Sequence, residues 1–428
     1  MTQRDSKKAI FGWAMYDWAN SAFATTIIAG FFPVFFKEFW SAGVDPTIST
    51  ARLGLSNSIE GIAVAILAPI LGAIADKSTA KKKFLAFFAF LGVIMTSSLY
   101  LIAQGKWQTA VIVFVLGNVG YSGSLIFYDA LITGVASDKK MDFVSALGYS
   151  LGYLGGGLLF AVNIWMTLKP ATFGFANAAA AVRFSFLSVG VWWAVFSAPI
   201  FLLVQEPEGS ETLAGRSAIK AGFLQLKNTF AEIRHLKNIF LFLAAYWLYI
   251  DGVDTIIRMA VDYGMSIGFD SKGLIVALLI TQFVGFPAAI GFGYLGGKIG
   301  AKRAIFFAIA VYLGVSIWGA FMRAKYEFYI LAIIIGLVQG GLQALSRSFY
   351  AKIIPVDKSA EYFGFYNMLG KFAAVIGPGL MGGVVLLVKA LGYSSQAASR
   401  LSITSLSLLF LGGGILFYFV KEEKAKEE

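Results

Sequence analysis

Long apolar segments alternate with short polar loops along almost the whole chain of 428 residues. As a helix, about 20 apolar residues cross the ~30 Å hydrocarbon layer of a bilayer. The pattern therefore predicts an all-α integral membrane protein with twelve transmembrane helices and both termini on one side. The predicted spans lie near 10–36, 52–75, 84–103, 108–135, 143–166, 183–204, 239–261, 273–296, 304–322, 327–349, 362–388 and 401–420.

Two short basic loops indicate an internal repeat. Residues 72–83 and 293–303 each end one apolar segment and start another, and they begin 221 positions apart (293 − 72). Asp17 and Asp251 also match, at an offset of 234 (251 − 17). A duplicated chain of apolar segments is typical of membrane transporters built from two halves.

The repeat predicts three parts. Residues 1–204 are expected to form an N-terminal six-helix bundle, and 239–428 a pseudo-symmetric C-terminal bundle with a short charged tail. Residues 205–238 interleave apolar and basic side chains, which favours an amphipathic linker on the inner membrane surface.

Composition supports a membrane location. The chain is 58% hydrophobic and 14% charged, whereas about 25% charged residues is usual for soluble proteins. Most of its 35 Lys and Arg fall in the termini and in alternate loops. The positive-inside rule then places both termini in the cytoplasm of a bacterial inner (plasma) membrane. This bias also explains the net charge of +11 without a nucleic-acid partner.

The chain offers little for catalysis or for cofactors. Cysteine is absent and the single histidine, His235, lies in a polar stretch, so we expect no metal and no cofactor. The glycine runs at 152–157 and 377–383 lack the Gly-Lys-Ser/Thr ending of a phosphate loop. We therefore expect neither an enzyme nor an ATP-driven pump.

Polar residues deep in the predicted spans are the candidates for substrate binding, because a charge at membrane depth usually faces a polar interior. In the first and seventh spans they recur at helical spacing on one face. The functional interpretation is a cavity lined from both halves. The alternative is charge pairs that lock helices together, such as Asp254 with Arg258. The predicted substrate residues are Asp17, Asn20, Asp251, Asp254, Arg258, Gln339, Gln343, Asn367 and Lys371.

Without a nucleotide motif, transport needs an ion gradient or runs as uniport. Burial of a carboxyl disfavours its charged form and promotes proton exchange. Glu60, in the outer half of the second predicted span, is the favoured proton-coupling residue. A sodium site and plain uniport remain alternatives.

The first basic loop resembles the signature loop of the major facilitator superfamily, through Gly72, Asp76, Lys77, Lys81 and Lys82. The resemblance implies that Asp76 caps the inner end of the eleventh helix, near 358–362, and steadies the outward-open state. In the second half, Gly297 stands where this aspartate belongs. The predicted gating residues are Asp76, Lys77, Lys81, Asp129, Lys298, Arg303 and Arg347.

Residues 12–26, 251–258 and 340–348 resemble the branch that contains the fungal vacuolar effluxer linked to autophagy and its bacterial relatives. The resemblance implies a monomeric secondary transporter in the lipid bilayer that works by rocking of its halves. Opposed charges in one cavity favour a small zwitterionic, amino-acid-like substrate. Alternatives are a non-transporting receptor or scaffold, and a lipid-handling member of the superfamily.

Overall fold

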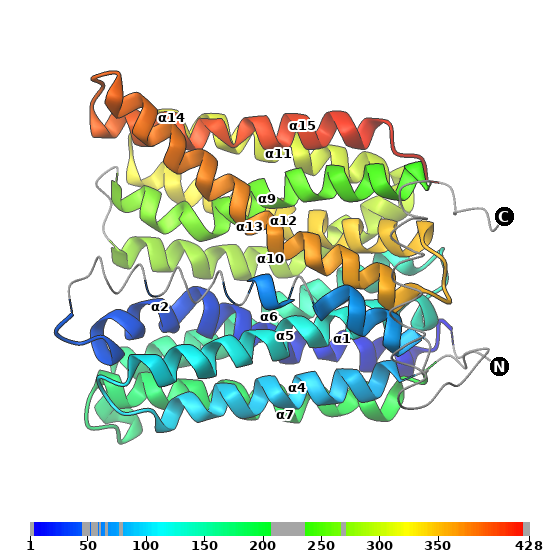
Figure 1. Cartoon of the computed structure of the whole chain (residues 1–428), viewed down its shortest axis with the longest axis horizontal. Helices are drawn as coiled ribbons and strands as arrows, with labels where there is room; N and C mark the ends of the chain where they lie inside the picture. Colours follow the sequence, from blue (N-terminus) through cyan, green and yellow to red (C-terminus); the bar gives the residue numbers. More distant parts are fainter. Residues whose placement is uncertain are drawn as a thin grey trace. The chain divides into compact units, whose positions relative to one another are not determined.

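The computed structural model of the chain (Figure 1) describes residues 4–44, 52, 59, 61–64, 67–76, 80–206, 236–266 and 271–422. For 261–262, 265–266, 271–272, 274–275, 371–375 and 395 it describes the backbone alone. Throughout these ranges the chain forms helices joined by short loops. It divides into two compact units, which we describe one at a time.

The first unit combines most of the first half of the chain with a short piece of the second. It comprises Met1–Ser137, Leu151–Leu226 and Asp357–Asn367. Its helices are α1 (Lys7–Ala22), η1 (Phe23–Phe31), α2 (Phe32–Phe35), η2 (Phe36–Trp40), α4 (Lys81–Ser98), η3 (Leu99–Leu101), α5 (Trp107–Val135), the later part of α6 (Met141–Leu168), η4 (Pro170–Phe173), α7 (Ala178–Leu203) and the first residues of α13 (Ser359–Ala390).

The second unit comprises Asp138–Ser150, Lys227–Val356 and Met368–Glu428. Each unit thus holds the first residues of one helix whose remainder belongs to the other unit. The helices of the second unit are the start of α6, α9 (Lys237–Ser266), α10 (Ser271–Ile299), α11 (Ala301–Phe321), α12 (Lys325–Ile353), the remainder of α13, α14 (Ser395–Ser405) and α15 (Ser407–Tyr418).

Ten helical segments among the described residues are long and apolar enough to cross a membrane. Two shorter apolar helices, Gly61–Asp76 and Ile376–Ala390, lie in the predicted second and eleventh spans. The all-helical membrane architecture is therefore confirmed. The first span, Lys7–Trp40, continues four residues beyond its predicted end at 36. The linker predicted over 205–238 lies almost wholly outside the described residues, so the three-part division stays a prediction.

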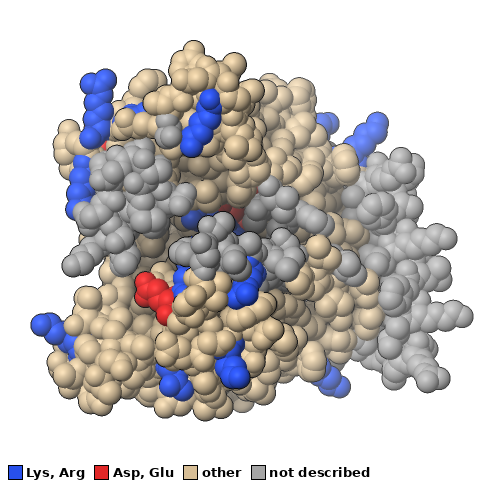
Figure 2. Space-filling view, turned by 60° about the vertical axis from the view of Figure 1, so that its left-hand side comes forward, with Lys and Arg blue, Asp and Glu red and all other residues tan. Residues whose placement is uncertain are grey.

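The surface agrees with this location. On the face shown in Figure 2, most of the described surface carries no Lys, Arg, Asp or Glu. Large apolar side chains are exposed along the predicted spans, for example Phe87 at 63% and Leu202 at 80%. In a bilayer such side chains face lipid, so they carry no cost of hydration.

The first span departs from regular α-helix. The Phe32 N–H bonds to the Ile27 carbonyl and the Ser41 N–H bonds to the Phe36 carbonyl, each five residues back. Such wide π-helical turns are rare and occur often at functional sites. Here the first of them follows α1, the helix that carries Asp17 and Asn20.

Helices α4 and α5 pack closely because two glycines meet. A Cβ atom on Gly120 would lie 2.4 Å from the Gly92 nitrogen. Small residues at such crossings let helix backbones approach closely, which is a main source of packing energy within a membrane.

We expect Gly120→Ala to destabilise the protein by about 1–3 kcal/mol, because the added methyl overpacks this crossing. The measurement is thermal unfolding of the purified protein in detergent. Gly314→Ala is the matched control, since nothing lies within 4 Å of a Cβ placed at Gly314. Equal melting temperatures for the two variants would show that α4 and α5 do not cross this closely.

Candidate functional site

Asp17 lies in an aromatic cluster of the first unit. The side chain is 6% exposed, and its Oδ2 accepts a hydrogen bond of 2.7 Å from the Tyr128 hydroxyl. Trp13 stacks on the Tyr128 ring at 4.5 Å and donates its Nε1–H to the Tyr128 carbonyl at 2.9 Å. The cluster fixes the orientation of the Asp17 carboxyl. The next turn of the same face carries Asn20, which is 1% exposed, and its Nδ2 has no hydrogen-bond partner among the described residues.

The structure brings Asn367, a predicted substrate residue, against Asp129, a predicted gating residue. The Asn367 Nδ2 donates to Asp129 Oδ2 at 3.2 Å and to the Phe363 carbonyl at 2.9 Å. Both partners belong to the first unit, in which α13 begins. Asp129 is 5% exposed. The contact therefore ties the first turns of α13 to α5.

Asp251 is the most buried acidic residue among those predicted to bind substrate, with an exposed fraction of 0%. Its Oδ1 accepts the Gly377 N–H at 2.9 Å and the Thr255 hydroxyl at 3.2 Å. Its Oδ2 has no hydrogen-bond partner among the described residues. Gly377 precedes Pro378, which lies inside α13 and interrupts its hydrogen-bond ladder. The carboxyl thus sits where two helices of the second unit meet at an irregular turn.

The other predicted substrate residues of the second unit differ in burial. Gln339 is 8% exposed and its Oε1 is also unpaired among the described residues. Asp254 and Gln343 are half-buried, whereas Arg258 is exposed. Glu60, Lys77 and the side chain of Lys371 lie outside the described residues, so their predicted roles stay predictions.

Asp76 contacts the first turn of α13 in the way that the signature loop implies. Its carboxylate accepts the N–H groups of Ala360 at 3.2 Å and Glu361 at 2.8 Å. Such amides carry the positive end of the helix dipole and favour an anion. Lys81 completes this cluster, with its Nζ 2.8 Å from Asp76 and 3.0 Å from the Ser359 hydroxyl. We call Asp76, Lys81 and the α13 start the first latch; its role in gating stays a prediction.

Glu206 stabilises the helix start that carries Lys81 of the first latch. Its carboxylate accepts the backbone N–H groups of Lys81 and Lys82 and so caps the start of α4. Burial raises the pKa of the Glu206 carboxyl, and the two N–H donors and the neighbouring lysine charges only partly oppose this. Glu206 is not among the residues predicted from the sequence, because it follows the sixth span and belongs to no motif.

The second unit holds a different cluster, although Gly297 lacks the acid of the signature loop. Asp142, in the first turn of α6, accepts hydrogen bonds from the Ser348 hydroxyl at 2.7 Å and from the Lys352 Nζ at 2.8 Å. Arg347 donates its Nε–H to the Ser145 hydroxyl and an Nη2–H to the Ser145 carbonyl, both at 2.9 Å. We call Asp142, Ser145, Arg347, Ser348 and Lys352 the second latch.

Asp142 is not among the residues predicted from the sequence, although the repeat contains a signal for it. Asp142 and Glu361 lie 219 positions apart (361 − 142), and each stands in the first turn of its helix. Two predicted gating residues, Lys298 and Arg303, are exposed. The structure therefore does not place them in either latch.

Two other basic-loop lysines have matching structural roles. The Lys82 Nζ donates to the carbonyls of Phe201 and Val204 at 2.8 and 2.7 Å. Lys302, 220 positions later (302 − 82), donates to the carbonyls of Tyr418 and Val420 at 2.8 and 2.6 Å. Each lysine satisfies free carbonyls at the end of the last helix of its half.

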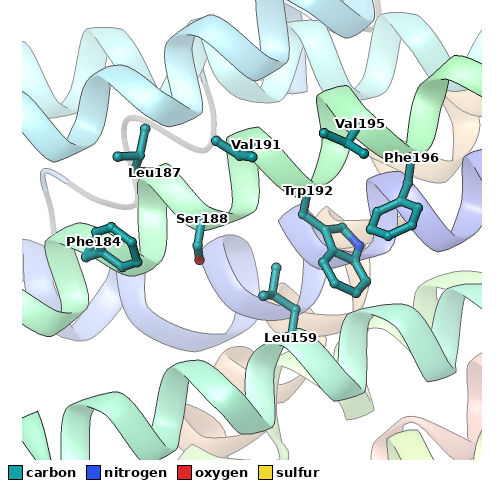
Figure 3. Close-up of a pocket in the computed structure, with 8 residues that line it drawn as sticks. All are labelled: Leu159, Phe184, Leu187, Ser188, Val191, Trp192, Val195 and Phe196. Carbon is teal, nitrogen blue, oxygen red and sulfur yellow. The ribbon is translucent and has the colours of Figure 1, made fainter. Parts of the chain in front are cut away.

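An apolar cavity of about 350 Å³ lies between α6 and α7 in the first unit (Figure 3). Ser188 contributes the one hydroxyl among its lining residues. Val191 and Val195 on its wall are more than half exposed, as expected of a surface that meets lipid. This cavity is unsuited to a charged metabolite. Its lining residues are Leu159, Phe184, Leu187, Ser188, Val191, Trp192, Val195 and Phe196.

Solved structures share this fold. The chain matches the proton:xylose symporter XylE with a TM-score of 0.69 at 13% identity, over 97% of this chain and 95% of that one. It matches a bacterial homologue of the iron transporter ferroportin with a TM-score of 0.67 at 13% identity, over 96% and 98%. The chain therefore has the major facilitator fold, as predicted.

Sequence comparison defines the family within that fold. The model of the vacuole effluxer Atg22-like family matches residues 47–428. An uncharacterised MFS-type transporter of Bacillus subtilis, YxiO, is 36% identical over 97% of this chain and 95% of its own length. Autophagy-related protein 22 of Coccidioides immitis is 22% identical over 90% and 83%. The chain belongs to the Atg22-like family of MFS transporters, and it is an integral membrane transporter, not an enzyme.

We expect Asp76→Asn to loosen the first latch, because it weakens two hydrogen bonds and removes an ion pair. Since the chain has no cysteine, Ser359→Cys creates a single thiol at a buried position of this latch. Loss of about 1.4 kcal/mol would raise the rate of maleimide labelling tenfold. Lys83→Ala, an exposed neighbour, is the control. An unchanged rate in Asp76→Asn would show that Asp76 does not hold the latch closed.

Lys82→Met and Lys302→Met should each lower the free energy of unfolding by about 1–3 kcal/mol, because each removes charge-assisted hydrogen bonds to helix-end carbonyls. Thermal unfolding of the purified variants measures this. Lys83→Met keeps the same loop and changes an exposed side chain. If all three variants melt at the wild-type temperature, the lysine caps contribute nothing measurable.

Proposed function

We propose that this transporter moves a small zwitterionic, amino-acid-like metabolite by alternating access, driven by an ion gradient. One observation carries the proposal. Three predicted substrate residues each hold a buried polar atom with no hydrogen-bond partner among the described residues: Asn20 Nδ2, Gln339 Oε1 and Asp251 Oδ2.

Unpaired polar atoms are costly inside a membrane protein, at about 1–3 kcal/mol each. A fold retains them when another molecule satisfies them in the working cycle. In the first unit, Asn20 offers a donor, which suits the carboxylate of such a metabolite. In the second unit, Gln339 and Asp251 offer acceptors, which suit its ammonium group. Lys371, also predicted to bind substrate, adds a cation for the carboxylate.

The two latches supply the gating in this proposal. Each consists of contacts between the start of one helix and residues distant in sequence, so each can break while its helices stay folded. Rocking of the halves breaks the contacts of the latches and exposes the polar atoms to water. The family description as effluxers favours export as the direction. We further propose that the protein acts as a monomer in the plasma membrane, with both termini cytoplasmic.

Two alternatives predict different outcomes. A receptor or scaffold on this fold would bind without transport. A lipid-handling member would use an apolar path, for which the cavity between α6 and α7 is the described candidate. The buried polar atoms without partners favour a polar substrate over a lipid, and the family favours a transporter over a receptor.

The test is a thermal-shift screen of the purified protein against the twenty amino acids, followed by efflux of any stabilising compound from proteoliposomes. Binding to the folded state raises its melting temperature. We expect Gln339→Ala to weaken binding of that compound about tenfold, which corresponds to about 1.4 kcal/mol. Because the Gln339 Oε1 bonds to no described residue, the variant should fold normally.

Gln104→Ala, at an exposed loop position, is the matched control and should bind as the wild type does. Binding without efflux would favour the receptor. Efflux of a lipid, but of no amino acid, would favour the lipid-handling alternative. Unchanged affinity in Gln339→Ala would remove this residue from the substrate site.

A further inference from the structure

Asp251 presents an unusual chemical situation for a carboxyl in a membrane-spanning helix. Its Oδ1 accepts hydrogen bonds from the Gly377 N–H and the Thr255 hydroxyl, both of them uncharged donors. Its Oδ2 has no hydrogen-bond partner among the described residues, and the residue is fully buried. The described residues also form no ion pair with it. An ionised carboxylate would therefore hold its charge in an apolar setting without a counter-charge.

Three other buried acids, Asp17, Asp76 and Asp142, bind a side chain of a neighbouring helix or loop. Asp76 pairs with Lys81, and Asp142 pairs with Lys352, each at 2.8 Å. Asp17 accepts a hydrogen bond from the Tyr128 hydroxyl. Unlike these three acids, Asp251 has a fully buried carboxyl oxygen without a hydrogen-bond partner among the described residues. This contrast separates Asp251 from acids whose role is to join helices.

The charged groups around α9 do not change this conclusion. On α9 itself, Asp254 would repel a charge on Asp251, and Arg258 is exposed. Arg347 of α12 and Arg400 of α14 are bound elsewhere, to Ser145 and to the Ala320 carbonyl. The remaining titratable residues lie on α9 and on the helices that pack against it: Lys237, Tyr246, Tyr249, Asp262 and Tyr263 of α9, Lys272, Tyr294 and Lys298 of α10, Lys325, Tyr326, Glu327, Tyr329, Tyr350 and Lys352 of α12, Glu361, Tyr362, Tyr366, Lys371 and Lys389 of α13, and Tyr418 of α15.

We propose that Asp251 is the proton-carrying carboxyl of this transporter, protonated at neutral pH in the state described here. The proton lies on the carboxyl while the site is closed to water. When the site opens, the proton passes to water and leaves an ionised Asp251. This proposal rests on the proposed transport function and adds its coupling site. It also differs from the sequence-based candidate, Glu60, which lies outside the described residues.

Protonation also accounts for the chemistry at the two oxygens. A neutral carboxylic acid keeps one carbonyl-type oxygen as acceptor, which matches the two donors on Oδ1. Its other oxygen carries the hydrogen, which matches the absence of a donor at Oδ2. The cationic group of a substrate and a proton would then compete for the same oxygen. Such competition couples their movements in opposite directions, as export driven by proton entry requires.

Infrared difference spectroscopy of the full-length protein in proteoliposomes tests the proposal with protons alone as the probe. A protonated carboxylic acid has a C=O stretching band that a carboxylate lacks. At neutral pH the wild type should show such a band, and ¹³C-aspartate labelling should shift it. Asp251→Asn should remove it, whereas Glu60→Gln and Asp17→Asn should retain it.

Each contrary outcome is distinct. If the labelled wild type shows no protonated aspartate, or if Asp251→Asn keeps the band, the proposal is wrong. If sodium chloride abolishes the band while potassium chloride does not, Asp251 is a sodium site and the proton assignment fails. The wild-type labelling needs no variant, so poor folding of Asp251→Asn leaves the test intact. A confirmed band without transport of any amino acid would overturn the proposed function and leave the protonation of Asp251 standing.

Discussion

The hydrocarbon interior of a bilayer supplies no water to polar side chains, and this constraint explains the placement of many polar side chains in the part of the chain that the structure describes. Asp142 receives a hydroxyl and an ammonium, and Arg347 binds both polar atoms of Ser145. Two lysines of the basic loops, Lys82 and Lys302, bind carbonyls at helix ends. Other buried polar atoms of the described residues also lack a hydrogen-bond partner, among them the hydroxyls of Thr26, Thr96 and Ser122. Asn20, Gln339 and Asp251 are informative because the sequence also predicts them to bind substrate.

The two latches show that structural repeats need not repeat their chemistry. In the first, the Asp76 carboxylate binds backbone amides at a helix start, so the partner's side chains matter little. In the second, Asp142 stands on the helix itself and binds side chains of α12. The glycine at 297 explains the difference, since that loop offers no acid. The second basic loop thus lacks the aspartate of the first, and Asp142 supplies the carboxylate of the second latch instead.

The sequence predicted the architecture well because hydrophobic length and loop charge are local properties. The predicted span 143–166, for example, corresponds to Met141–Leu168. Motif-based residues such as Asp76 could also be found. Glu206 could not be found in this way, because its role depends on a contact with Lys81, 125 positions away (206 − 81). Asp142 has only the indirect signal of the repeat, because its partner Lys352 lies 210 positions away (352 − 142). Sequence patterns also cannot tell a carboxyl that accepts a hydroxyl hydrogen bond on Oδ2, as Asp17 does, from one whose Oδ2 has no partner among the described residues, as in Asp251.

The central claim is that Asp251, a buried carboxyl of the second unit, couples transport to protons. Its most direct test compares two fluxes of one radiolabelled neutral amino acid in proteoliposomes: exchange at equal pH, and accumulation driven by an imposed pH gradient. The account predicts that the wild type performs both, and that Asp251→Asn retains exchange but loses accumulation. Accumulation in Asp251→Asn equal to that of the wild type would contradict it.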